Sequence, residues 1–397
     1  MHRKYKFLLR PTAKQQDALN GALRLHCEIY NAALEHRREA WKHGVRVSFV
    51  SQSHEWVEVR SLRPDAGALN STSVQQTLRR LDKAFQAFFR RVKAGQKPGY
   101  PRFKSAARWA SIDFVMQAPF DGGLRDGRIR VPGIGSVRCH QHRPIPDGAR
   151  VKQVTVKQVT VKREGRRWYA VLSCDDVPAK PLPQTGAVVG VDLGVASFLT
   201  TSDGKHVPNE RHLAASAVRL ATAQQALSRC KRGSARRRAV RARVAAIHGK
   251  VRRQRLDHAH KTALALVRDC DFIAHEALNV AGMTKAPAAR PDGEGGYLPN
   301  GAAAKAGLNR SILDAGWGVF LDVLRAKAES AGRVVVEVNP RNTSRRCAAC
   351  GHTAAGNRVT QAAFCCVSCG HTDHADVNAA INILRAGLAL RDVATAA

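Results

Sequence analysis

Four cysteines near the carboxyl end of the chain have the spacing of a metal site. Cys347 and Cys350 form one C-x2-C pair, and after fifteen intervening residues Cys366 and Cys369 form a second. In a four-cysteine zinc site, each such pair holds one side of a tetrahedral Zn²⁺ ion. Because four thiolates already close the coordination shell, the pattern predicts one structural zinc ion rather than a catalytic one.

The residues around the two pairs agree with this interpretation. A glycine and a histidine follow each pair, as Gly351–His352 and Gly370–His371, and the glycines supply the permissive backbone that a tight turn needs. Either histidine could replace a thiolate, but the four cysteines leave no ligand missing. Cys365 is a spare thiol, since the x2 spacing selects Cys366. Chance clustering of buried thiols is the alternative, and the paired spacing disfavours it.

Three acidic residues could hold catalytic metal ions. Asp192 lies inside the apolar stretch VVGVDLGV, where a bare carboxylate is costly without a partner. Glu276 ends a second apolar stretch, DFIAHEALNV, and Asp376 follows the second cysteine pair at the start of an alanine-rich helix. A two-metal phosphodiesterase needs such carboxylates to converge from different strands on Mg²⁺ ions about 3.5–4 Å apart.

Each of these acids also has an ordinary structural interpretation. Asp192 could be a turn residue, and Glu276 could cap a helix. The alternative is strongest for Asp376, because aspartate is a favoured residue at a helix N-terminus.

The charge of the chain indicates a polyanionic partner. Its 397 residues carry 65 Lys and Arg against 31 Asp and Glu, a net charge of +34, and 44% of them are hydrophobic. Such a chain is a folded basic protein and not a disordered tail. From Arg211 to Leu256 there are fourteen basic residues and no acidic one, which favours a phosphate-backbone surface over a solvated helix. The candidate contacts are Arg229, Lys231, Arg232, Arg236, Arg237, Arg238, Arg241 and Arg243.

Neither a membrane span nor an export signal is evident in the sequence. The longest apolar runs have the length of strands, and the first ten residues, MHRKYKFLLR, lack an apolar core. Without export, clustered cysteines indicate metal binding rather than disulfides. We therefore expect a cytoplasmic protein that binds nucleic acid.

The first hundred residues show helical periodicity. One helix is predicted over Lys14–Trp41, with Thr12 as its cap. A second has an apolar stripe that we interpret as core. The stripe consists of Val74, Leu78, Leu81, Phe85, Phe88, Phe89 and Val92.

The chain changes character twice after residue 94. Residues 95 to 185 alternate as antiparallel strands do, including a doubled VKQVT. From Gly186 onward, apolar strands alternate with helices, which predicts an α/β layer. One of these helices is expected to carry a single stripe of Leu313, Trp317, Phe320, Leu321 and Leu324.

Several of these motifs, in this order, resemble one known family. They are GVDLGVASFLTTSDG, HEALNV, GLNRSILDAGWGVF, VNPRNTSRRCAACG and CVSCGHTDHADVNAAINI. Together they resemble the RuvC-like half of TnpB proteins, transposon-encoded RNA-guided nucleases related to the compact type V CRISPR effectors. The resemblance covers Gly186 to Leu384, and the amino-terminal segment is also similar to that of the family.

The resemblance implies an RNase H-like RuvC nuclease whose catalytic acids are Asp192, Glu276 and Asp376. It also implies that the zinc ribbon is an insertion in this domain, so that the chain leaves the sheet after VNP and returns at HADVNAA. The chain departs from the usual family pattern at two places: His374 and Ala375 replace Asp-Arg, and His275 stands where an aliphatic residue is common.

The expected fold class is α/β, an RNase H-like RuvC domain with an inserted zinc ribbon, a helical lobe and a β-rich domain. The expected boundaries are 1–13 for the first strand of a β-rich wedge-like domain, 14–94 for a helical recognition lobe, 95–185 for the rest of the wedge-like domain, 186–345 for the first part of the RuvC-like domain, 346–372 for the zinc ribbon and 373–397 for the carboxy-terminal RuvC helix.

The function that the resemblance implies is RNA-guided cleavage of DNA. The expected cofactors are catalytic Mg²⁺, two ions in number, and one structural Zn²⁺. The expected partners are a guide RNA and a target DNA, with no membrane, and a monomer is favoured over a dimer. Two alternatives stay open: an RNA-guided DNA-binding repressor that does not cut, and a transposase that joins strands.

Overall fold

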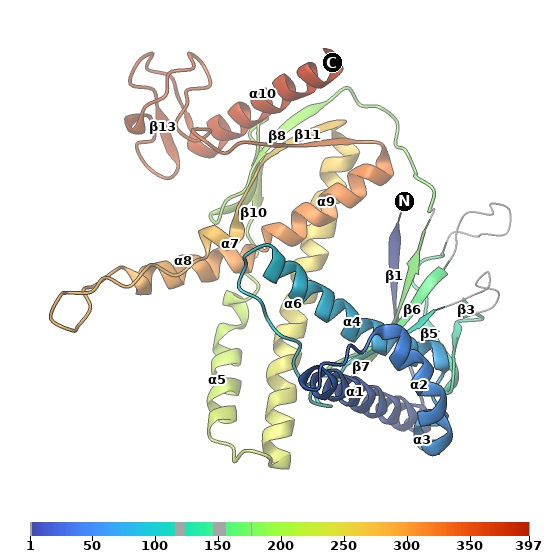
Figure 1. Ribbon diagram of the computed structural model, residues 1–397. Helices are drawn as coiled ribbons and strands as arrows, with labels where there is room; N and C mark the ends of the chain where they lie inside the picture. Colours follow the sequence, from blue (N-terminus) through green and yellow to red (C-terminus); the bar gives the residue numbers. More distant parts are fainter. Residues whose placement is uncertain (1, 116–123, 146–155, 176, 397) are drawn as a thin grey trace. The chain divides into compact units, whose positions relative to one another are not determined.

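The computed structural model describes residues 2–115, 124–145, 156–175 and 177–396 (Figure 1). The chain divides into two compact units, Met1–Val177 and Pro178–Ala397, which are considered separately. The first copy of the VKQVT repeat, residues 151–155, lies outside the described residues.

The first unit contains a seven-stranded antiparallel sheet in the order β2-β6-β7-β1-β5-β4-β3. Its elements are β1 (Arg3–Arg10), α1 (Ala13–Lys42), α2 (Phe49–Leu62), α3 (Pro64–Gly67), α4 (Ser71–Lys93), β2 (Ser111–Val115), β3 (Leu124–Arg125), β4 (Arg128–Val131), β5 (Gly135–His140), β6 (Val156–Glu164) and β7 (Arg167–Cys174). β1 lies inside the sheet because its alternate residues Tyr5, Phe7 and Leu9 are buried in the core.

Two helix predictions for this unit can be compared with the structure. Helix α1 confirms the predicted helix, and Thr12 caps it through the backbone N–H of Gln15. In α4, the first half of the predicted apolar stripe is buried, but Phe89 and Val92 are 57% and 50% exposed. The interpretation of the whole stripe as core is therefore wrong, since the ring of Phe89 packs on other rings of α4 rather than on the core.

The second unit is an α/β layer with a small ribbon attached. Its elements are β8 (Val188–Asp192), β9 (Ser197–Thr201), β10 (His206–Pro208), η1 (Ala214–Ser216), α5 (Ala217–Ser228), α6 (Ala235–Asp269), β11 (Phe272–Glu276), α7 (Val280–Met283), α8 (Ala302–Ala315), α9 (Trp317–Ala331), β12 (Val334–Val338), η2 (Ala355–Asn357), β13 (Ala363–Cys365), β14 (Thr372–His374) and α10 (Ala375–Ala396).

The five-stranded sheet of this unit has the order β10-β9-β8-β11-β12. β10, β9 and β8 are antiparallel neighbours, whereas β8, β11 and β12 run parallel. In the register of the parallel strands, Val191 lies beside His275. Because Asp192 and Glu276 each come one residue later, the carboxyl ends of β8 and β11 bring both acids to the same edge of the sheet.

Helices cover both faces of this sheet. On one face, Ile273 packs with Leu266 of α6 and Phe320 of α9. On the other face, Phe272 and Ala274 pack with Ile383 of α10 (Figure 1). α10 therefore returns the chain to the sheet after the ribbon.

The predicted stripe from Leu313 to Leu324 is interrupted. Gly316 adopts a left-handed conformation with φ of 74°, which ends α8 and starts α9 in a new direction. Trp317 and Leu324 are buried as expected, but Leu313 is 54% exposed. Its assignment to the buried stripe is wrong, because a stripe cannot continue through a change of helix axis.

Two glycines allow α10 to approach the sheet closely. A Cβ atom at Gly190 of β8 would lie 2.0 Å from the carbonyl oxygen of Ala380, and one at Gly387 would lie 2.5 Å from the Cβ of Ala274. Any side chain at Gly190 would push the helix that carries Asp376 away from the strand that carries Asp192.

We predict that Gly190→Ala destabilises the second unit by about 1–3 kcal/mol, since the obstructing atom is backbone and cannot rotate away. Thermal unfolding followed by circular dichroism measures the change. Gly318→Ala is the matched control, because no atom lies within 4 Å of that Cβ and its helix α9 should gain up to about 1 kcal/mol. Equal stability of the two variants would contradict the close approach.

Candidate metal centre and acidic site

The four predicted cysteines lie together in the ribbon. The ligand sulfurs of Cys347, Cys350, Cys366 and Cys369 are all within 4.8 Å of one another. The Cys347–Cys369 and Cys350–Cys366 sulfur pairs are 3.8 and 3.6 Å apart. Zn–S bonds of about 2.3 Å in a tetrahedron place sulfurs about 3.8 Å apart, whereas a disulfide bond is only about 2.05 Å long. The spacing therefore fits a structural zinc ion.

Two matching turns present these sulfurs. The backbone N–H of Gly351 donates to the carbonyl of Cys347 at 3.0 Å, and that of Gly370 donates to the carbonyl of Cys366 at 2.9 Å. Both glycines have positive φ, 79° and 72°, which explains why glycine follows each pair. Cys365, the spare thiol, lies on strand β13 outside this group.

Two asparagines of α10 clamp the ribbon to the sheet domain. The Asn378 side chain accepts from the backbone N–H of Ala348 and donates to the carbonyl of Arg346, both at 2.8 Å. One turn later, the Asn382 amide donates to the carbonyls of Thr343 and Arg346 at 3.0 and 2.6 Å. Both asparagines are buried, so these bonds fix where the ribbon leaves and re-enters the domain.

The structure brings the three predicted acids into one electrostatic group. Asp192 ends β8, Glu276 ends β11, and Asp376 lies in the first turn of α10. Burial, together with the negative charges of Glu276 and Asp376, raises the pKa of Asp192 to about 7. Burial also raises the pKa of Glu276. Carboxylates so placed are unfavourable without a cation.

Arg358 of the ribbon supplies positive charge to this group. Its Nη2 lies 3.3 Å from Oδ1 of Asp376 and donates at 3.0 Å to the carbonyl of Gln361. The same guanidinium lowers the pKa of both Asp192 and Glu276, against the larger effect of burial.

Thr343 links the acidic group to the asparagines of α10 that bond to the ribbon. Its hydroxyl donates to Oε1 of Glu276, which opposes the rise in the pKa of that carboxyl. Its carbonyl accepts from Asn382. One continuous set of hydrogen bonds therefore connects Glu276, the ribbon and α10.

The acids do not form a compact ligand set by themselves. In the part of the chain that the structure describes, the four cysteines are the group of three or more potential ligands that lies within 4.8 Å. The three carboxylates interact at longer range, with Arg358 and Thr343 bonded to two of them. Carboxylate oxygens are the ligands that suit a hard divalent cation such as Mg²⁺.

Sequence reasoning missed Arg358, Thr343, Asn378 and Asn382. A signal existed for the asparagines: their i, i+4 spacing in VNAAIN puts two amides on one face of a helix that is otherwise apolar. Buried amides need partners, so this face should have predicted a polar contact. For Arg358 and Thr343, the sequence offers no comparable pattern.

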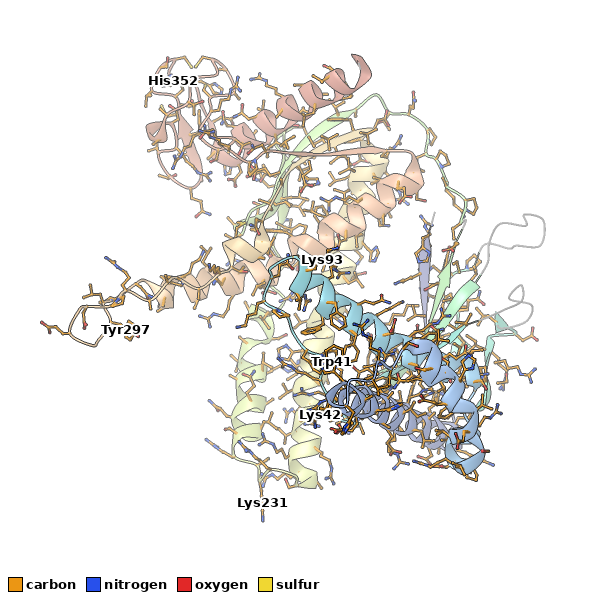
Figure 2. The ribbon with its side chains drawn as sticks, viewed as in Figure 1. Trp41, Lys42, Lys93, Lys231, Tyr297 and His352 are labelled. Carbon is orange, nitrogen blue, oxygen red and sulfur yellow. The ribbon has the colours of Figure 1, made fainter. Side chains whose placement is uncertain are left out.

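The predicted basic segment forms the α5–α6 hairpin, whose tip is at Lys231 (Figure 2). Most of its candidate residues are exposed. Arg237 differs, because its Nη1 donates to the carbonyls of Leu227 and Cys230 at 2.8 and 3.0 Å and so closes the hairpin. Arg238 donates to the carbonyl of Gly233 at 2.9 Å but remains exposed.

Comparisons with known families give three matches. Residues 157–286 match the OrfB_IS605 family, described as "Probable transposase". Residues 317–383 match "Cas12f1-like, TNB domain", and this range contains the cysteine ribbon. Residues 1–46 match a "Helix-turn-helix domain", although the structure has one strand and one helix over that range.

Similar proteins span nearly the whole chain. The chain is 32% identical to "Putative RNA-guided DNA endonuclease InsQ" of Escherichia coli K12, over 97% of this chain and 92% of that protein. It is 33% identical to a "Putative RNA-guided DNA endonuclease" of Streptomyces pristinaespiralis, over 98% of this chain and 90% of that protein.

Solved structures resemble the chain less closely. CasPhi-2 (Cas12j) bound to crRNA has a TM-score of 0.48 at 12% identity, covering 98% of each chain. The Cas12f1–sgRNA–target DNA complex has a TM-score of 0.35 at 17% identity, covering 97% of this chain and 99% of that one. Because these scores are low, the fold assignment depends on the strand order described above.

A mixed sheet in this order, with a cysteine ribbon inserted before its last helix, is the architecture expected for an RNase H-like, RuvC-type domain. The predicted α/β fold class is confirmed. Within that class, the 32% identity to InsQ over 97% of the chain shows the family, and the chain belongs to the TnpB family of OrfB_IS605 proteins.

We predict one tightly held Zn²⁺ per chain, detected by elemental analysis of the folded protein. Cys350→Ser should lose the ion and destabilise the ribbon, because a structural zinc ion contributes directly to folding. Cys365→Ser is the matched control and should keep both zinc and stability. Equal zinc loss in the two variants would contradict the ligand assignment.

A second prediction concerns pH. The pKa of Asp192 rises from its ordinary value of 3.8 to about 7 in the folded protein, so the folded state binds this proton more tightly than the unfolded state does. The resulting stability is fully present below the ordinary pKa and is lost as pH rises through the folded pKa. Without divalent metal, Asp192→Asn should therefore be more stabilising near pH 8 than near pH 5, by about 1–3 kcal/mol. Thermal unfolding in buffer without added divalent metal, and without a chelator that would remove the structural zinc, measures this difference.

The control for this experiment is Asp322→Asn, at an exposed aspartate of α9, which should show no such pH-dependent gain. Added Mg²⁺ should stabilise the parent at pH 8 more than it stabilises Asp192→Asn. A gain that is the same at both pH values would mean that Asp192 is not protonated in the folded metal-free protein.

Proposed function

We propose that this chain is an RNA-guided DNA endonuclease that hydrolyses phosphodiester bonds with Asp192, Glu276 and Asp376. The observation that carries the proposal is the electrostatic group of these three acids at one edge of the sheet. The names of the similar proteins, which cover nearly the whole chain, support both the RNA guide and DNA as substrate.

The acids would hold divalent metal ions, for which Mg²⁺ is the proposed identity and two the proposed number. Bound there, such ions activate water and stabilise the charge that develops on the phosphate. The raised pKa of Asp192 means that its proton must leave before its carboxylate can serve fully as a ligand. Thr343 orients Glu276 through its hydroxyl, and Arg358 balances charge around Asp376.

Two rival functions use the same fold. A repressor guided by RNA but unable to cut would not need three acids, and the chain has kept all three. A strand-joining transposase would use the same acids, and the description of the matching family, "Probable transposase", favours this alternative. The names of the similar proteins favour cleavage.

The proposed partners are a guide RNA and a target DNA, and the proposed oligomeric state is a monomer. The exposed basic residues of the α5–α6 hairpin provide a surface for the phosphate backbone. Of the helices in the described residues, none is long and apolar enough to cross a bilayer.

We predict that Asp192→Asn, Glu276→Gln or Asp376→Asn abolishes cleavage of a guide-matched plasmid while leaving guide and target binding largely intact. Each acid acts on metal, whereas affinity comes from many contacts elsewhere. Asp322→Asn is the control and should cut at the parental rate. Asparagine caps a helix as well as aspartate does. Full cutting by Asp376→Asn would therefore mean that Asp376 caps α10 and is not a catalytic acid.

A further prediction concerns the hairpin. Replacing Arg236, Arg241 and Arg243 with Gln should weaken nucleic-acid binding and flatten its dependence on log salt, by about 0.7–0.9 for each phosphate that is no longer neutralised. Affinity measured over a range of salt concentrations gives this slope. Arg237→Gln should instead destabilise the hairpin, because its guanidinium bonds two backbone carbonyls. An unchanged slope for the triple variant would leave the hairpin as a solvated surface.

A further inference from the structure

A cavity of about 530 Å³ lies beside the acidic group, in the second unit. Its walls come from the turn after β8, the segment before α5, helix α8 and the ribbon. Its volume falls in the range of small-molecule sites, which suits one or two nucleotides and is too small for a duplex.

The cavity and the acids share parts of the same backbone. Val195 and Ala196, which line the cavity, follow Asp192 in the turn between β8 and β9. On the ribbon side, the carbonyl of Gln361 accepts from Arg358, and the same guanidinium nitrogen reaches Asp376. The segments that line the cavity are therefore adjacent to those that carry Asp192 and contact Asp376.

The cavity is positively charged. Arg211 and Arg310 line it, and in the described part of the chain neither guanidinium has a carboxylate partner. The acid in its wall, Asp314, is already satisfied: its oxygens accept from Arg255 at 2.6 and 3.0 Å and from the backbone N–H of Leu213 at 2.9 Å. A ligand would therefore meet two uncompensated cations.

The remaining lining suits the rest of a nucleotide. Val195, Leu213 and Ala217 offer apolar surface to a sugar or base, and Ser311 offers a hydroxyl. The Asn209 side chain shapes the cavity, since it donates to the carbonyl of Val195 at 2.9 Å and accepts from the N–H of Arg211 at 3.3 Å. The latter hydrogen bond accompanies a left-handed Arg211, with φ of 45°.

We propose that this cavity binds a phosphate of the DNA strand being cut, one or two nucleotides from the scissile bond, and that Arg310 and Arg211 contact that phosphate. The proposal rests on the proposed function. It assigns roles to two residues of the GLNRSILDAGWGVF motif that are not part of the acidic group. Arg310 binds the DNA strand, and Asp314 stabilises the wall of the cavity. Both arginines are positioning residues in this scheme, because they fix the strand without touching the reacting atoms.

The test combines protein variants with neutral linkages in the DNA. The guide-loaded protein is given target DNAs that carry a single methylphosphonate, one position at a time, on either side of the scissile bond. For the parent, one of these neutral linkages should slow cleavage about tenfold, the loss expected when one charged hydrogen bond disappears. Arg310→Gln should cut the unmodified DNA about tenfold more slowly and should lose its sensitivity at that same position.

Lys261→Gln is the matched control, because it removes one exposed charge of α6 that does not line the cavity. It should cut like the parent and keep the parent's sensitivity to the neutral linkage. Arg211→Gln provides a second variant that should share the behaviour of Arg310→Gln. Target binding, measured with the same DNAs, should change by less than about twofold for all of these variants, since a single phosphate contributes little to the total affinity.

Three results would overturn the proposal. Arg310→Gln and Arg211→Gln could both cut at the rate of Lys261→Gln. The effects of the variant and of the neutral linkage could multiply at every position, which would show that they act independently. Arg310→Gln could also weaken target binding as much as cleavage, which would assign the cavity to guide or target binding. Failure of the parent itself to cut would reject the proposed function, and this subsite would fall with it.

Discussion

The burial of Asp192 near two other acidic side chains is the constraint on which the second unit depends. Asp192, Glu276 and Asp376 come from two strands and a helix, and burial together with their charges raises the pKa of Asp192 to about 7. Such a group opposes folding in the absence of a cation. The structure offsets part of this cost with the hydroxyl of Thr343 and the guanidinium of Arg358, both of which lower the pKa of Glu276. In the proposed function, a divalent metal ion bound by the three acids would offset the cost that remains.

Holding Asp376 in this group requires a rigid attachment for α10, and two features provide it. Glycine at 190 lets the helix lie directly on β8, where a side chain would collide with the carbonyl of Ala380. Asn378 and Asn382 then bond to the backbone at the base of the ribbon. The ribbon is too small to be stabilised by a hydrophobic core alone, so the four cysteine ligands take the place of that core. Metal binding in the ribbon thus stabilises the loop that carries Arg358 to the acids.

The sequence predicted the parts of this arrangement that have a local signature. The cysteines were found by their spacing, Asp192 by the cost of a charge in an apolar strand, and Glu276 by its place at the end of a second apolar stretch, while the resemblance implied that these two acids act together with Asp376. Long-range partners were not predictable in this way. Thr343 reaches Glu276 across 67 positions of sequence, and Arg358 reaches Asp376 only because the ribbon folds back. The predicted stripes failed where tertiary structure overrides periodicity, at the Gly316 break and at the exposed end of α4. Arg237 was assigned to nucleic acid, but the structure commits its guanidinium to the hairpin backbone.

If the proposed function is correct, the electrostatics of the whole chain explain how an acidic site acts on an anionic substrate. Three carboxylates repel a phosphate, yet the chain around them carries a net charge of +34. The exposed arginines of the α5–α6 hairpin attract the polyanion at long range, where the acids contribute little to the total field. Close to the site, Arg211 and Arg310 present uncompensated charge in the adjoining cavity, because Arg255 has already neutralised Asp314. In the proposed function, the arginines attract the nucleic acid and the carboxylates hold the metal ions, and Arg358 and Asp376 form an ion pair between these two sets of residues.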